Sequence, residues 1–169
     1  MLKLKENRNK KTKQRDKYGD VLSRLGEEDE KIVVLTADLA GSTRTIEFGR
    51  KFPERFFNVG ITEANMMGMA AGLAMEGNKP FVSTFSVFAV GKPWEQIRQT
   101  VAYQSASVRI VATHSGITVG EDGASHQILE DIAITRVLPN MKVIVTADYV
   151  EKEAVINRIA GDMEGPVYV

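Results

Sequence analysis

Apolar runs that alternate with helix-forming stretches constrain the fold of this chain more than any other feature. The runs cover residues 31–37, 56–61, 80–84, 108–113, 141–146 and 166–169. Several are almost uninterrupted by polar side chains, which is typical of strands buried on both faces in a parallel sheet. The stretches between them are long enough for crossover helices. We therefore predict an α/β fold: a three-layer, doubly wound, mostly parallel sheet with helices on both faces.

The intervening stretches carry apolar residues at helical spacing. We predict helices over residues 16–25, 64–75, 93–101 and 149–160, and an apolar-periodic segment over 126–138. Gly26 is expected to end the first helix, and Thr62 to cap the second. Residues 40–43 (Ala-Gly-Ser-Thr) are expected to form a loop. Residues 64–75 are apolar on nearly every face, so we expect that helix to lie inside the protein.

Size and composition favour one intracellular domain. The chain has 169 residues, 43% of them hydrophobic, which is enough for one core and too few for two ordinary domains. It has no cysteine, no apolar run long enough to span a bilayer and no signal-peptide pattern. We expect a cytoplasmic protein that does not enter membranes.

Charge is concentrated at the N-terminus although the formal net charge is zero. Residues 1–17 hold eight Lys or Arg against two acids, with no aromatic side chain among them. Such a segment is more typical of a solvated leader than of a nucleic-acid site. We expect residues 1–14 to form a disordered basic leader and residues 15–169 to form the folded domain, with no nucleic-acid partner.

Glu63 is the one acid in the stretch from residue 56 to residue 75. A carboxylate at the start of a buried helix experiences two opposed effects, because burial favours its neutral form while the free amides of the helix favour its charged form. One interpretation is that it only satisfies those amides. The other is that it exchanges protons with a ligand.

Polar and aromatic side chains follow the strands at their C-terminal ends, where ligands bind in open parallel sheets. Asp38 follows the first run, Glu63 the second, Phe85 and Phe88 the third, and His114 the fourth. The two phenylalanines have the spacing of core residues, but in a cleft they would flank a flat heteroaromatic ring.

A glycine-rich loop over residues 113–127 holds both histidines, His114 and His126, together with Asp122. Their spacing fits no zinc pattern, so no metal site is predicted. Such side chains suit a polyhydroxylated or phosphorylated substrate whose protons they shuttle, or a loop held by its own hydrogen bonds. Arg15 and Ser42 are residue types that bind phosphate.

With these residues in view, the sequence resembles the pyrimidine-binding domain of transketolases from Arg15 to its C-terminus. The specific motif is residues 120–127, Gly-Glu-Asp-Gly-Ala-Ser-His-Gln. The resemblance implies transfer of a two-carbon ketol unit between sugar phosphates, with thiamine diphosphate as the cofactor. It further implies that Glu63 hydrogen-bonds the aminopyrimidine and activates the cofactor.

The resemblance also assigns roles to the other candidates. Asp38, Phe85 and Phe88 would join Glu63 around the cofactor. Asp122 and His126 would bind the donor sugar, with His126 also catalytic. Arg15, Ser42 and His114 would hold the sugar phosphate.

Departures from the family pattern concern both the pocket and the completeness of the site. Residues 124–125 are Ala-Ser where Pro-Thr is usual, Ser115 replaces an Asp, and Gly91 stands where a tyrosine often completes the aromatic pocket. The Gly-Asp-Gly to Asn motif that binds Mg²⁺ and the diphosphate is missing. The resemblance therefore implies a chain that is incomplete and inactive alone and joins a diphosphate-binding domain or subunit in a homodimer or hetero-oligomer.

Three alternatives stay open. Deoxyxylulose-phosphate synthase and the beta subunit of 2-oxo acid dehydrogenases share the fold and the glutamate. Residues 120–127 favour the transketolase reading because they keep the acid and the histidine suited to a sugar donor. A third reading, from another class, is a non-catalytic assembly module that keeps the fold as a partner-binding surface.

Overall fold

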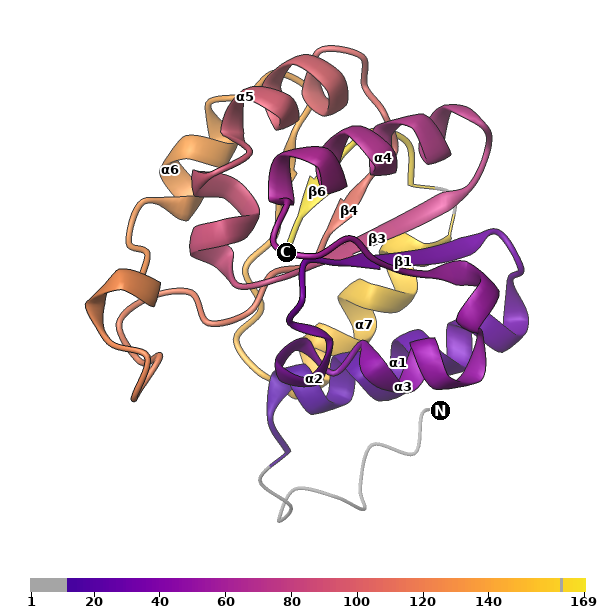
Figure 1. Cartoon of the computed structure of the whole chain (residues 1–169), viewed down its shortest axis with the longest axis horizontal. Helices are drawn as coiled ribbons and strands as arrows, with labels where there is room; N and C mark the ends of the chain where they lie inside the picture. Colours follow the sequence, from indigo (N-terminus) through magenta and orange to yellow (C-terminus); the bar gives the residue numbers. More distant parts are fainter. Residues whose placement is uncertain (1–11, 162) are drawn as a thin grey trace.

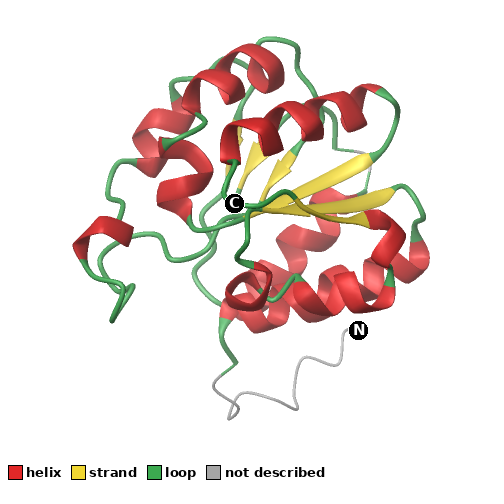
Figure 2. Ribbon diagram, in the orientation of Figure 1, coloured by secondary structure: helices red, strands yellow, loops and turns green. Residues whose placement is uncertain are grey.

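The computed structural model describes residues 12–161 and 163–169, so most of the expected leader lies outside the described residues. Six strands form one sheet in which every neighbouring pair is parallel, in the order β2-β1-β3-β4-β6-β5. The strands are β1 (Ile32–Thr36), β2 (Phe56–Asn58), β3 (Lys79–Ser83), β4 (Arg109–Ile110), β5 (Lys142–Val143) and β6 (Val167–Tyr168). The predicted three-layer α/β fold is confirmed (Figures 1 and 2).

Helices cover both faces of the sheet (Figure 1). One face carries α1 (Gln14–Glu28), α2 (Ala40–Thr43), α3 (Ile46–Lys51) and α7 (Tyr149–Ala160). The other carries α4 (Glu63–Met75), the π-helices η2 (Val87–Gly91) and η3 (Ile97–Ala102), α5 (Trp94–Gln96) and α6 (Asp131–Arg136). Two 3₁₀ turns, η1 (Pro53–Arg55) and η4 (Ala124–His126), complete the described elements.

The alternation of side chains along β1 explains why the core has two halves. Ile32 and Val34 pack with the helices α1, α3 and α7, whereas Val33 and Leu35 pack with α4 and the π-helices. All five residues of β1 are buried. A strand with both faces covered has no polar side, which is why its sequence reads as an unbroken apolar run.

Element boundaries follow the prediction most closely where a local signal sets them. The side chain of Asp148 accepts hydrogen bonds from the amides of Val150 and Glu151, and α7 begins and ends as predicted. Gly26 does not end α1, which continues to Glu28. The expected loop at residues 40–43 is a single helical turn, α2.

The helix α4 differs from the prediction in its surroundings. Met66, Met67 and Ala70 are buried, but Ala64, Gly68 and Gly72 lie on an exposed face. The expectation that this helix lies inside the protein is therefore wrong for the chain by itself. The Thr62 side chain does not cap it either: its hydroxyl donates to the carbonyl of Val59.

The segment after β3 is attached to α6 through the indole of Trp94, whose Nε1 donates to the carbonyl of Ile134 at 2.8 Å. This contact fixes the two helical segments that follow β3 and β4 against each other. In the part of the chain that the structure describes, no helix is both long and apolar enough to cross a bilayer.

Candidate active site

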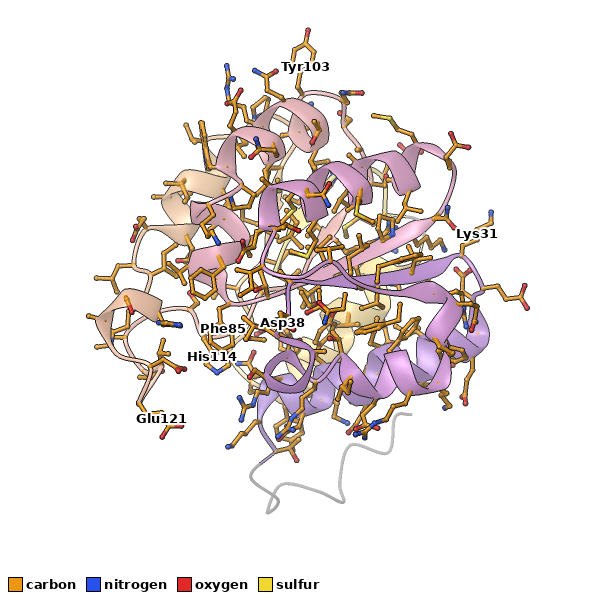
Figure 3. All side chains as sticks on the ribbon, in the orientation of Figure 1. Lys31, Asp38, Phe85, Tyr103, His114 and Glu121 are labelled. Atoms are coloured by element: carbon orange, nitrogen blue, oxygen red, sulfur yellow. The ribbon has the colours of Figure 1, made fainter. Side chains whose placement is uncertain are left out.

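The strand register brings the predicted site residues to one edge of the sheet. Thr36 of β1 pairs with Ser83 of β3, so Asp38 and Phe85 each lie two residues beyond the same pair. Phe85 in turn forms a bridge with Thr113, which places His114 next to it. Asp38, Phe85 and His114 thus meet at the C-terminal edge, whereas Lys31 marks the opposite end of β1 (Figure 3).

Glu63 opens α4 and is only 3% exposed. Its Oε2 lies 2.6 Å from Nζ of Lys92, whose side chain is 50% exposed. Lys92 follows η2 directly, four residues after Phe88, and its Nζ also lies 5.7 Å from the centre of the Phe88 ring. The acid is therefore buried, ion-paired and beside an aromatic wall.

Four rings gather next to this ion pair. Phe85 and Phe88 are nearly parallel, with centroids 6.2 Å apart. The ring of His114 lies 3.9 Å from that of Phe85, and the ring of His126 meets Phe88 edge-on at 5.1 Å. Offset and edge-on contacts of this kind suit a pocket that accepts another flat ring.

Arg15 and His114 form the second part of the site. A guanidinium nitrogen of Arg15 lies 3.3 Å from Nε2 of His114 and 3.5 Å from the carbonyl of Ser42. Because arginine only donates, Nε2 accepts and the Nδ1–H group donates to the hydroxyl of Thr113 at 2.8 Å. Burial and the charge of Arg15 lower the pKa of His114, while Asp122 acts in the opposite direction. Burial and the charge of Arg15 are the two larger effects, and both favour the neutral imidazole.

Backbone strain is found at the same edge. Asp38 and His114 have φ angles of 59° and 60°, a left-handed conformation that is uncommon for residues other than glycine. The backbone amide of Asp38 donates to the side-chain Oδ1 of Asn58 at 3.0 Å. The side-chain Nδ2 of Asn58 donates back to the Asp38 carboxylate at 3.3 Å. Strain held by the surrounding structure is typical of functional sites.

The predicted sugar-binding residues differ in how firmly they are held. Nδ1 of His126 forms a hydrogen bond with the hydroxyl of Ser125 at 3.0 Å. The His126 ring also packs on Phe88, so it joins the cluster of rings. Asp122 is exposed, and its charge acts on the site by favouring a higher pKa of His114. Ser115, one of the departures from the family pattern, donates to Asp131 at 2.7 Å.

A cavity of about 710 Å³ extends from Arg15 and His114 toward the first turn of α7. Asp131, buried on its wall, accepts hydrogen bonds at Oδ2 from the hydroxyls of Ser115 and Tyr168. Burial is the main reason that the pKa of Tyr168 is raised, so the phenol stays a donor. The cavity also reaches Lys152.

Two residues of this site were missed in the sequence, Lys92 and Asn58. Asn58 was detectable as a polar residue at the C-terminal end of a strand. Lys92 follows Phe88 by one helical turn, but its pairing with Glu63 joins two separate segments and has no local signal. Among the described residues, no group of three or more His, Cys, Asp or Glu has the arrangement of a metal site.

Comparisons with known proteins agree with the resemblance seen in the sequence. Residues 10–169 match the family described as transketolase, pyrimidine binding domain. A putative transketolase C-terminal section from Methanocaldococcus jannaschii is 59% identical over 90% of this chain and 48% of that protein. A 1-deoxy-D-xylulose-5-phosphate synthase from Lawsonia intracellularis is 40% identical over 82% of this chain and 22% of that protein.

A solved structure described as a split gene transketolase, inactive beta4 tetramer, is 52% identical to this chain with a TM-score of 0.80. The match covers 92% of this chain and 50% of that one. The chain thus spans about half the length of these two transketolase relatives.

Proposed function

This chain belongs to the transketolase pyrimidine-binding domain family, and from that premise we propose that it supplies the pyrimidine-binding half of a thiamine-diphosphate-dependent transketolase. The enzyme would move a two-carbon ketol unit between sugar phosphates. The observation that carries the proposal is the Glu63 carboxylate, which is 3% exposed and pairs with Lys92, whose Nζ lies 5.7 Å from the centre of the Phe88 ring. An assembly module has little use for a buried acid whose ion-pair partner lies against a cluster of aromatic rings.

The chemistry of the side chains fits an aminopyrimidine. The ring has N–H groups for a carboxylate acceptor and a flat face for aromatic neighbours. Glu63 would accept the hydrogen bond, and Phe85 and Phe88 would flank the ring. Gly91, three residues after Phe88, is exposed, and an added Cβ there would meet nothing within 4 Å.

The remaining residues act on the substrate. When bound, thiamine diphosphate supplies the carbon nucleophile for ketol transfer. His126, held by Phe88 and Ser125, would move a proton at the reacting hydroxyl of the sugar, and Asp122 would bind a neighbouring hydroxyl. Arg15 and His114 would hold the anionic end, with the neutral imidazole acting as a hydrogen-bond partner.

A diphosphate-binding domain or subunit would complete the site. The sequence has no Gly-Asp-Gly to Asn motif for Mg²⁺ and the diphosphate, and the chain spans about half of its transketolase relatives. The exposed face of α4 around Gly68 and Gly72 lies on the same helix as Glu63 and offers a surface for a diphosphate-binding partner. We expect the chain alone to be inactive, which is in line with the description of its split-gene relative.

The experiment is calorimetric titration of thiamine diphosphate with Mg²⁺ into the chain alone and into its complex with a diphosphate-binding subunit. We expect tight binding in the complex only, lost together with turnover in Glu63→Ala. The matched control is Glu76→Ala, which removes an exposed acid at the other end of α4. Full turnover in a folded Glu63→Ala complex would reject the proposed role.

The donor substrate separates the two enzyme classes. A transketolase takes its two-carbon unit from a ketose phosphate, whereas a deoxyxylulose-phosphate synthase takes it from pyruvate. The higher identity to the transketolase section favours the first. Turnover of the complex with pyruvate and not with ketose phosphates would favour the second.

A further inference from the structure

Two hydrogen bonds close the base of the glycine-rich loop. The hydroxyl of Ser115 donates to Oδ2 of Asp131 at 2.7 Å, and the amide of Gly116 donates to the carbonyl of Ile128 at 2.9 Å. Gly116 and Ile128 also form an antiparallel bridge. We call these two pairs of residues the loop base. The chain between them leaves the body of the protein and returns to it at one place.

The rest of the loop has few polar ties of its own. In the part of the chain that the structure describes, all hydrogen bonds of residues 117–126 are internal to the loop. Beyond the loop, the ring of His126 meets that of Phe88 edge-on at 5.1 Å. Glu121, at the tip, stands away from the sheet (Figure 3). The positions of Asp122 and His126 therefore depend on how firmly the loop base is held.

Asp131 connects the loop base to the sheet. It is the first residue of α6 and is 4% exposed. The Oδ2 atom that accepts from Ser115 also accepts from the hydroxyl of Tyr168, in β6, at 2.7 Å. Hydrogen bonds to a carboxylate are stronger than those between neutral groups. A single oxygen atom thus joins the start of the loop, α6 and the sheet.

The same helix is also tied to the segment that carries the aromatic wall. The carbonyl of Ile134, three residues after Asp131, accepts the indole N–H of Trp94 at 2.8 Å. Trp94 follows Phe88 by six residues on the segment after β3. The His126 ring and the Phe88 ring, which meet edge-on, are therefore both placed through α6.

We propose that Asp131 is a positioning residue of the transfer reaction, which fixes the loop base so that Asp122 and His126 stand at the reacting end of the donor sugar. This inference rests on the proposed function for the roles of those two side chains. Asp131 itself acts only through the loop. Its removal would leave the hydroxyls of Ser115 and Tyr168 without their shared acceptor, and a misplacement of about 1 Å can cost about a hundredfold in rate.

The kinetic test uses the chain in complex with a diphosphate-binding subunit. Asp131→Ala should lower kcat/KM for the ketose phosphate donor at least tenfold. Its affinity for thiamine diphosphate, measured by calorimetry, should change less than twofold, because Glu63 and Phe88 lie outside the loop. The matched control is Glu130→Gln, which alters the neighbouring exposed acid and should leave both quantities unchanged.

A double exchange tests the contact itself. Asp131→Ser combined with Ser115→Asp keeps one carboxylate and one hydroxyl at the loop base and reverses their places. Position 115 is exposed, so it can hold the carboxylate without burying its charge. We expect the double variant to recover at least a third of the kcat/KM of the wild type. Recovery no better than that of Asp131→Ala, or a loss of cofactor affinity as large as the loss of donor turnover, overturns the inference.

Hydrogen exchange in the chain alone provides a measurement that needs no activity. The amides of Gly116, at the loop base, and His126 should exchange at least fivefold faster in Asp131→Ala than in the wild type or in Glu130→Gln. Asp131→Asn keeps the shape of the side chain and should show a smaller change in the same direction if Asp131→Ala does not fold. Unchanged exchange in a folded variant overturns the inference. Faster exchange, together with a wild-type complex that is inactive on ketose phosphates, would reject the proposed function and leave the loop base standing.

Discussion

Lys92 holds the carboxylate of Glu63 at 2.6 Å, and the same Nζ lies 5.7 Å from the centre of the Phe88 ring. Glu63 is 3% exposed, and the oxygen that Lys92 contacts is Oε2. An aminopyrimidine that binds Glu63 at Oε2 would therefore compete with Lys92. In the free chain the acid is thus held in an ion pair with Lys92.

Replacing Lys92 should strengthen cofactor binding. In Lys92→Met the carboxylate has no internal competitor, so thiamine diphosphate should bind the two-subunit complex about fivefold more tightly, equivalent to about 1 kcal/mol for a pair with one solvated partner. Calorimetry measures the change. Arg98→Met, which breaks the surface pair with Glu95, is the control and should have no effect. Weaker binding in Lys92→Met would mean that Lys92 contacts the cofactor instead.

Gly91 should accept a tyrosine. An added Cβ there meets nothing within 4 Å, so Gly91→Tyr should change the free energy of unfolding by less than about 1 kcal/mol. The new ring would extend the wall formed by Phe88, and we expect slower cofactor release from the complex. Stopped-flow dissociation measures this, with Gly91→Ala as the control. Faster release in Gly91→Tyr would show that the ring blocks the pocket.

The pKa of His114 should respond in opposite directions to its two charged neighbours. It lies below 6.5 because of burial and Arg15, so Arg15→Met should raise it and Asp122→Asn should lower it further. NMR titration of the imidazole measures both shifts. The same His114 pKa in the wild type, Arg15→Met and Asp122→Asn would show that neither charge acts on the imidazole.

The same pKa sets a stability trend. Below pH 6.5 the unfolded chain binds a proton that folded His114 resists, so the stability gained from the neutral ring is present above that pH and lost on acidification. The difference in unfolding free energy between the wild type and His114→Asn should therefore shrink as the pH falls from 7 to 5.

Lys152→Met should stabilise the chain. The pKa of Lys152 is about 8 in the folded chain against a usual 10.5, so below pH 8 the native state carries the full cost of a buried charge, about 3 kcal/mol at most. As the pH rises from 8 to 10.5, the folded lysine loses its proton first and this cost disappears. Denaturant unfolding at pH 7 and pH 10 should show the advantage of Lys152→Met shrinking. A constant difference would show that Lys152 has a charge partner.

The sheet and its edge were predictable because local patterns specify them. Apolar runs identify β1 and β3. Because all strands of the sheet are parallel, the residues that follow them, Asp38, Phe85 and His114, come to one edge. The limits of α7 were predictable because Asp148 caps it with its own side chain.

The exposed face of α4 and the partners of Glu63 were not predictable, for physical reasons. An apolar helix has the same composition whether its outer face meets its own chain or another subunit, so Gly68 and Gly72 carry no sign of exposure. Lys92 and Glu63 are brought together by packing between segments, and Lys152 reads in the sequence as an ordinary solvated residue of α7.

Trp94 is the single tryptophan of the chain, and it lies two residues after Lys92 with its indole hydrogen-bonded to the carbonyl of Ile134. Indole emission depends on such a hydrogen bond and on contact with water. Any rearrangement of the segment that carries Lys92 would therefore change the fluorescence of Trp94. The protein contains its own fluorescent reporter for events at Glu63, with no label to attach and no second tryptophan to subtract.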